Sequence, residues 1–151
     1  MEYETVQIEK TANVCPMCEN YAKSQASKPV VVMSCEGGCL RGEVARRAAN
    51  LLTFELAKEK TARLCLGGAF TKDTGQRALA RNASRIVAIE GCFIECASRM
   101  MKGVVPGLNP EVVIADRPYD FDRKLFGIDE MPDAQIVAHA REVANAVAVR
   151  L

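Results

Sequence analysis

Seven cysteines are the residues of this sequence best suited to chemistry, because they stand in a chain of 151 residues that we expect to reside in the cytoplasm. In such a reducing compartment structural disulfides are uncommon, and clustered thiols more often bind metal ions or carry out redox reactions. The odd number of cysteines also argues against a complete set of disulfides. His139 is the one histidine, so a metal site would be built mainly from sulfur, and four thiolates favour Zn²⁺ or an iron–sulfur cluster over magnesium or calcium.

The cysteines form three closely spaced pairs and one single residue. Cys65 is the single residue, and the pairs are Cys15 with Cys18, Cys35 with Cys39, and Cys92 with Cys96. A C-x₃-C spacing, as at Cys92 and Cys96, suits two metal ligands on a loop and the helical turn that follows it. A C-x₂-C spacing, as in "CPMC", is common both in zinc half-sites and in redox pairs.

The elements that must position these thiols alternate along the chain between strands and helices. Hydrophobic patterning and turn residues predict strands within 30–34, 61–69, 84–92 and 110–122, and helices within 43–57, 71–83, 93–102 and 133–151. Short links in this order require right-handed crossovers and a mainly parallel sheet between helix layers. We therefore predict a single three-layer, Rossmann-like α/β domain over residues 30–151.

A mainly parallel sheet would bring several cysteines to one edge. Cys35 ends the first predicted strand, Cys65 lies in the second and Cys92 follows the third, so all three can converge beyond the carboxyl ends of the strands. Cys39 and Cys96 lie one helical turn further on, near helix starts, where free N–H groups and the helix dipole favour the thiolate. These positions predict a thiolate metal site in a metal-binding domain.

Residues 1–29 form a polar stretch that we predict to be an irregular N-terminal arm. Its Cys15 and Cys18 are weaker ligand candidates, either folding over the main site or joining Cys39, also a weaker candidate, in a second site. They could equally be two exposed thiols. In the same way Cys65, within a strand, could be a core residue, and His139 is expected on the surface of the last helix.

Three segments resemble the DGC-domain family, whose members are described as zinc-binding proteins. They are "SCEGGCLRGEVARRAANLL", "CLGGAFTKDTGQRALARNA" and "AIEGCFIECASRMM", within roughly residues 30–105. Glu90-Gly91-Cys92 replaces the aspartate of the family's Asp-Gly-Cys triplet with glutamate. The resemblance implies metal binding more strongly than any reaction, and by position it implies that the metal ligands are Cys35, Cys65, Cys92 and Cys96.

An alternative hypothesis assigns the same opening loop to catalysis. Cys35 and Arg41 fit the C-x₅-R pattern between a strand and a helix, resembling low-molecular-weight tyrosine phosphatases and thiol-linked arsenate reductases. Such a loop aims N–H groups and an arginine at an oxyanion while the thiolate attacks, and Asp116 would be the candidate general acid. Gly42 replaces the Ser or Thr usual after the arginine, so this hypothesis ranks second.

Charge and hydropathy restrict the partners. Twenty basic and nineteen acidic residues give a net charge of +1 without a basic surface patch, so we expect no nucleic-acid binding. No apolar run approaches the roughly 18 residues that span a bilayer, so we expect a soluble protein with no membrane association. The sequence leaves open a homo-oligomer, any protein partner, and whether the metal is catalytic or purely structural.

Overall fold

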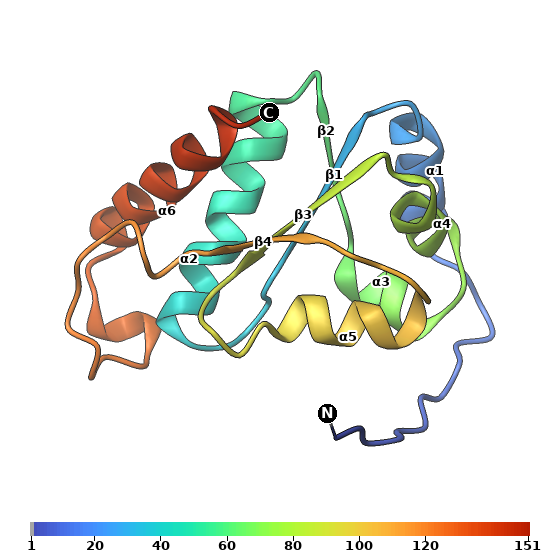
Figure 1. Ribbon diagram of the computed structural model, residues 1–151, viewed down its shortest axis with the longest axis horizontal. Helices are drawn as coiled ribbons and strands as arrows, with labels where there is room; N and C mark the ends of the chain where they lie inside the picture. The colour runs from blue at the N-terminus through green and yellow to red at the C-terminus, as the bar shows by residue number, and fades with distance from the viewer. Residues whose placement is uncertain (1) are drawn as a thin grey trace.

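The computed structural model describes residues 2–151, which form a parallel four-stranded sheet between two layers of helices (Figure 1). The strands are β1 (Val30–Ser34), β2 (Thr61–Arg63), β3 (Arg85–Glu90) and β4 (Glu111–Ile114), in the spatial order β2-β1-β3-β4. The prediction of a three-layer, Rossmann-like α/β fold is thereby confirmed.

The middle of the sheet is the pairing of β1 with β3. Val30 pairs with Arg85 and Ser34 with Ile89, so both strands run in register to the same edge. The chain leaves β1 toward β2 on one side and then crosses back to β3 on the other. The carboxyl ends of β1 and β3 therefore flank the topological switch point, where open parallel sheets bind ligands.

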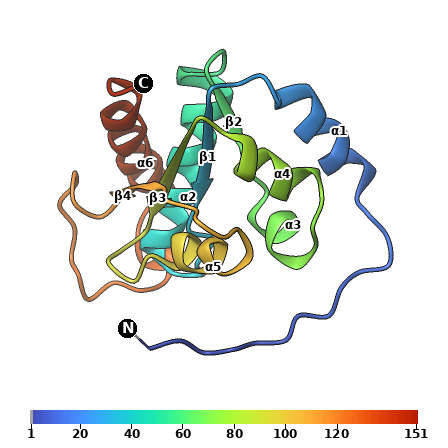
Figure 2. The ribbon, with the colours of Figure 1, turned by 45° about the vertical axis from the view of Figure 1, so that its right-hand side comes forward.

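Helices cover both faces of the sheet (Figure 2). The helix α2 (Leu40–Leu51), extended by a π-helical turn η1 (Leu52–Leu56), packs with α6 (Asp133–Ala148) on one face, where Val32 and Ile89 are buried. The short helices α3 (Leu66–Thr71) and α4 (Gly75–Asn82) and the helix α5 (Cys96–Val104) cover the other, over Met33 and Ala88. All five residues of β1 are buried, as expected of a central strand covered on both sides.

Three parts of the chain differ from the predicted elements. The expected irregular arm contains a helix, α1 (Pro16–Gln25), because Pro16 can start a helix and the helix packs on α4. The second strand ends at Arg63, so Cys65 begins α3 instead of lying within a strand. The last predicted strand, 110–122, is shorter in the structure, because β4 ends at Ile114. From there to α6 the chain runs through a long loop with one 3₁₀ turn, η2 (Ile128–Glu130). Among residues 2–151, no helix is both long and apolar enough to cross a membrane.

Candidate metal centre

Three glycines bring the two thiol-bearing loops into backbone contact at the switch point. A Cβ on Gly42, in the first turn of α2, would lie 2.5 Å from the carbonyl oxygen of Gly37. A Cβ on Gly91, directly after β3, would lie 2.8 Å from the backbone nitrogen of Gly42. Side chains here would push the chains apart, so glycine at these positions lets the loop after β1 meet the loop after β3.

Cys35 lies at the centre of this contact. It is 5% exposed, and its Sγ accepts the Gly37 N–H at 3.4 Å and the N–H of Gly91 from the other loop. Burial nevertheless dominates and raises the pKa of the Cys35 thiol, and the nearby Cys96 and Glu90 act in the same direction. A positive ion at this point would reverse that balance, because thiols that coordinate a metal are deprotonated.

Two of the sulfurs lie close to Gly37. A Cβ on Gly37 would lie 3.2 Å from the Sγ of Cys35 and 3.9 Å from the Sγ of Cys39, so the two thiols of this loop border the same glycine. Cys39 is half-buried and is the residue that precedes the first turn of α2. The donor type and the helix start are compatible with a cation held by thiolates.

The second loop supplies Cys92, which is half-buried, and Cys96, which is exposed as the first residue of α5. Glu95 between them has a left-handed backbone (φ 54°), which turns the chain sharply into the helix. Within residues 2–151, no three Cys, His, Asp or Glu side chains converge closely enough to hold a metal ion together. The loops are thus in contact, whereas their thiol side chains do not form a closed coordination shell.

Glu90 fixes the second loop by hydrogen bonds to the start of α5. The sequence pattern did not indicate this structural role. The Glu90 side chain is fully buried, and its carboxylate accepts the backbone N–H of Ala97 at 3.2 Å, the backbone N–H of Ser98 at 2.6 Å and the Ser98 hydroxyl at 2.7 Å. The carboxylate therefore occupies the N-terminus of α5 and fixes the start of the helix that carries Cys96. The acidic residue of the Glu-Gly-Cys triplet is in this structure a helix cap.

Cys65, expected in the same site, lies beside another cysteine. Its thiol neighbours Cys18, and the buried Gln76 joins the two backbones by accepting the Cys65 N–H and donating to the Cys18 carbonyl, both at 2.9 Å. Cys65 is exposed, so the interpretation as a core residue is wrong.

Cys39 lies near Tyr119, on the side of the sheet that α2 and α6 cover.

The alternative C-x₅-R hypothesis finds no support in the geometry. The Arg41 guanidinium lies 3.6 Å from Asp116, donates to the Arg123 carbonyl and stacks over Phe121, so it is engaged away from an anion loop. Asp116 is buried as the partner of that arginine. The raised pKa of Cys35 is also the reverse of what a thiolate nucleophile needs.

His139 is 8% exposed, which corrects the expected surface position. Its ring stacks on Tyr119 with the centroids 4.2 Å apart. Of the described residues, Tyr119 and His139 carry the buried polar side-chain atoms without a hydrogen-bond partner. The helical periodicity of α6 placed Ile136, Ala140 and Val143 in the core, and His139 shares their face because it lies three residues after Ile136 and four before Val143.

Comparison with known families complements this geometry. A family model described as the DGC domain matches residues 31–143, which include both loops, Cys65 and most of α6 but exclude Cys15 and Cys18. No curated protein and no solved structure matches the chain.

Proposed function

Because the chain belongs to the DGC-domain family, which is associated with metal binding, we propose that it binds Zn²⁺ through thiolates at the switch point of its sheet. The proposed ligands are Cys35 and Cys39 from the loop after β1, and Cys92 and Cys96 from the loop after β3. Cys65, which the family pattern also suggests, is the alternative to Cys39.

The observation that carries this proposal is the position of the Cys35 sulfur between the two loops. It accepts one N–H from Gly37 and one from Gly91, and hydrogen bonds of this kind orient a thiolate ligand and lower its charge density. Because Cys92 and Cys96 are respectively half-buried and exposed, their side chains have room to turn toward Cys35. Binding then requires side-chain rotation, while the backbones are already in contact.

Charge balance favours Cys39 as a ligand. It stands at the N-terminus of α2, a helix of 12 residues whose dipole partly offsets the formal charge near −2 of four thiolates on Zn²⁺. The N-terminus of α5 offers less, since Glu90 already occupies it with a buried carboxylate. The two helix starts are therefore unequal, and the ligand at α2 has the more favourable electrostatic environment.

The test is metal content after single substitutions. Cys35→Ser, Cys92→Ser and Cys96→Ser, purified anaerobically without added metal, are expected to lose bound zinc, and Cys15→Ser to retain it. Comparing Cys39→Ser with Cys65→Ser identifies the fourth ligand. Equal metal retention in all variants would refute the proposal, and iron with labile sulfide in the unsubstituted protein would replace zinc with a cluster.

A further inference from the structure

The helix α1 lies outside the matched family region, and side chains of several elements hold it in place. The Glu19 carboxylate accepts the Gly75 N–H at 2.8 Å, and the Tyr21 hydroxyl accepts the Arg63 N–H, also at 2.8 Å, from the outer edge of β2. A Cβ on Gly75 would lie 3.1 Å from the Cβ of Ala22, so α1 and α4 are in close contact. The first turn of α1, with its two cysteines, therefore has a fixed position.

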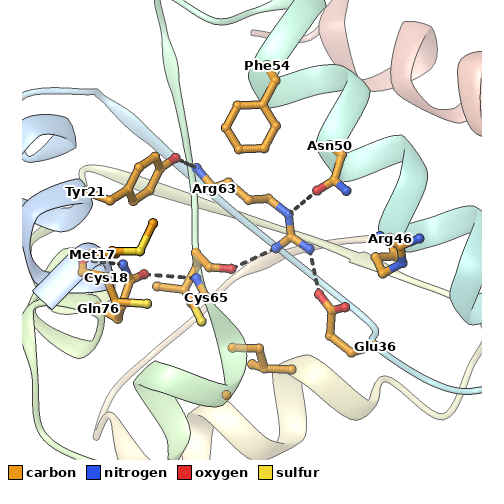
Figure 3. Close-up of a pocket in the computed structure, with 13 residues that line it drawn as sticks. Met17, Cys18, Tyr21, Glu36, Arg46, Asn50, Phe54, Arg63, Cys65 and Gln76 are labelled. Atoms are coloured by element: carbon orange, nitrogen blue, oxygen red, sulfur yellow. Dashed lines mark hydrogen bonds and ion pairs between the residues drawn. The ribbon is translucent and has the colours of Figure 1, made fainter. Parts of the chain in front are cut away.

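Gln76 connects this turn to Cys65. Gln76 is 1% exposed, and its side-chain amide makes one hydrogen bond to each backbone. The amide nitrogen donates to the Cys18 carbonyl, and the amide oxygen accepts the Cys65 N–H (Figure 3). The Cys18 thiol consequently lies between Cys15, one helical turn earlier, and Cys65. Three thiols from two distant parts of the sequence form one cluster.

The two cysteines of α1 have opposite environments. Cys15 is exposed, and the backbone N–H and thiol of Cys18 lower the pKa of its thiol. Cys18 is half-buried and lies against Cys15 and Cys65. An exposed thiol at the start of a helix, beside a second and less accessible thiol, is the arrangement that thiol–disulfide exchange uses, because the first attacks and the second resolves.

A cavity of about 580 Å³ borders the cluster, with Cys18 and Cys65 on its wall. Met17, Tyr21, Phe54 and Leu66 supply apolar surface around it. The Arg63 guanidinium on the same wall donates to Asn50, Glu36 and the Leu64 carbonyl (Figure 3), and also to the Ser34 hydroxyl. The cavity therefore suits an apolar or aromatic group better than an anion, and its volume is in the range of small-molecule sites.

We propose that Cys15 and Cys18 form a thiol–disulfide exchange site that reduces small disulfides with an apolar or aromatic body, held in the cavity beside Cys18. The Cys15 thiolate attacks one sulfur of the substrate, the substrate S–S bond breaks, and the departing thiolate takes a proton from solvent. Cys18 then loses its proton to solvent and attacks Cys15 Sγ, which releases the second thiol. The protein's two thiols become one disulfide as one substrate disulfide becomes two thiols.

A disulfide needs only two sulfurs, and Cys15 and Cys18 already interact. The exchange reaction uses thiols that the proposed zinc site does not require. Each proposal can therefore fail without the other.

The experiment adds one equivalent of dithiodipyridine, an aromatic disulfide with a chromogenic leaving thiol, to the reduced full-length protein under anaerobic conditions. We expect both leaving thiols to be released and peptide mapping to find a Cys15–Cys18 disulfide. Cys18→Ser should stop at a mixed disulfide on Cys15 with one thiol released. Cys15→Ser should slow the first release about tenfold, because the exposed attacking thiol at the start of α1 is lost. Asn20→Ala, which changes an exposed residue of α1, is the matched control and should react like the unsubstituted protein.

Three results would overturn the proposal. The first is a disulfide between Cys18 and Cys65, and the second is even modification of all seven cysteines without a preference for Cys15. The third is a metal ion in the purified protein that Cys15→Ser releases. Metal content measured on the same samples separates this failure from a failure of the zinc proposal, which predicts metal loss in Cys96→Ser and retention in Cys15→Ser.

Discussion

Gly91 lies so close to Gly42 that a Cβ on Gly91 would come within 2.8 Å of the Gly42 nitrogen. This contact joins the loop after β3 to the first turn of α2, and the Gly91 N–H reaches Cys35 across it. The glycine of the Glu-Gly-Cys triplet therefore determines how closely the two thiol-bearing loops approach. Gly91 acts on the thiols only indirectly: because it has no side chain, the backbones of the two loops can come this close.

Gly91→Ala is predicted to separate the two loops. The added methyl group meets backbone atoms that cannot move independently, so we expect a loss of about 1–3 kcal/mol in the free energy of unfolding and weaker metal binding. Urea unfolding and metal titration measure the two effects. Gly103→Ala in α5 is the control, since nothing lies within 4 Å of a Cβ there and alanine favours a helix. Equal behaviour of the two variants would refute this role of Gly91.

Glu90→Gln is predicted to loosen the start of α5. The amide retains one acceptor oxygen but turns an NH₂ group toward donors, so part of the buried network is lost at a cost of about 1–3 kcal/mol. Hydrogen exchange should show lower protection at Ala97 and Ser98, the residues that donate to Glu90. Glu142→Gln, on an exposed residue of α6, should change neither stability nor protection. Unchanged protection in Glu90→Gln would contradict the capping role.

Gln76→Leu is predicted to release the first turn of α1. Leucine has nearly the same volume but leaves the Cys18 carbonyl and the Cys65 N–H without their buried partner, which costs about 1–3 kcal/mol. Faster hydrogen exchange in α1 and faster alkylation of Cys18 would report the release. Gln135→Leu changes an exposed glutamine of α6 and provides the comparison. If Cys18 is alkylated equally fast in both variants, Gln76 does not hold the thiol cluster.

The stability of the reduced, metal-free protein is predicted to fall between pH 9 and pH 11. Cys18 has a folded-state pKa of about 11 against an ordinary value of 9.0, so in this range the unfolded chain loses a proton that the folded chain keeps. Fewer protons bound to the unfolded state means that stability decreases as pH rises. The lowered pKa of Cys15 contributes stability that is already complete above pH 9, so it does not affect this slope.

Urea unfolding at a series of pH values measures this dependence. Cys18→Ser should show a shallower decline than the unsubstituted protein, because serine does not titrate. Cys65→Ser keeps Cys18 and should retain most of the slope. Identical slopes in the unsubstituted protein and in Cys18→Ser would show that Cys18 does not retain its proton in the folded state.

The sequence predicted the layers of the fold and the shared edge of the loops that follow β1 and β3, because both follow from hydrophobic periodicity and from the order of strands. The position of β1 between β2 and β3 brought Cys35 and Cys92 to one edge, as expected. Periodicity did not reveal α1, whose helix is stabilised by contacts from Gly75, Arg63 and Gln76 far along the chain. Such tertiary contacts leave no local pattern.

Two individual residues were also misassigned for physical reasons. Cys65 was expected within a strand, but β2 ends at Arg63 and the glycines that follow start a helix instead of continuing the strand. His139 was expected on the surface because it is polar, whereas its ring is buried by stacking on Tyr119 from the loop after β4. For His139 the deciding partner, Tyr119, lies on another element.

We propose that thiolates of the two glycine-packed loops hold a zinc ion. Elemental mass spectrometry and a sulfide assay on the protein, purified anaerobically without added metal, measure whether such an ion is bound. We expect about one zinc per chain without labile sulfide, and loss of the zinc in Cys96→Ser. Folded protein without stoichiometric metal, or with iron and sulfide, would contradict it.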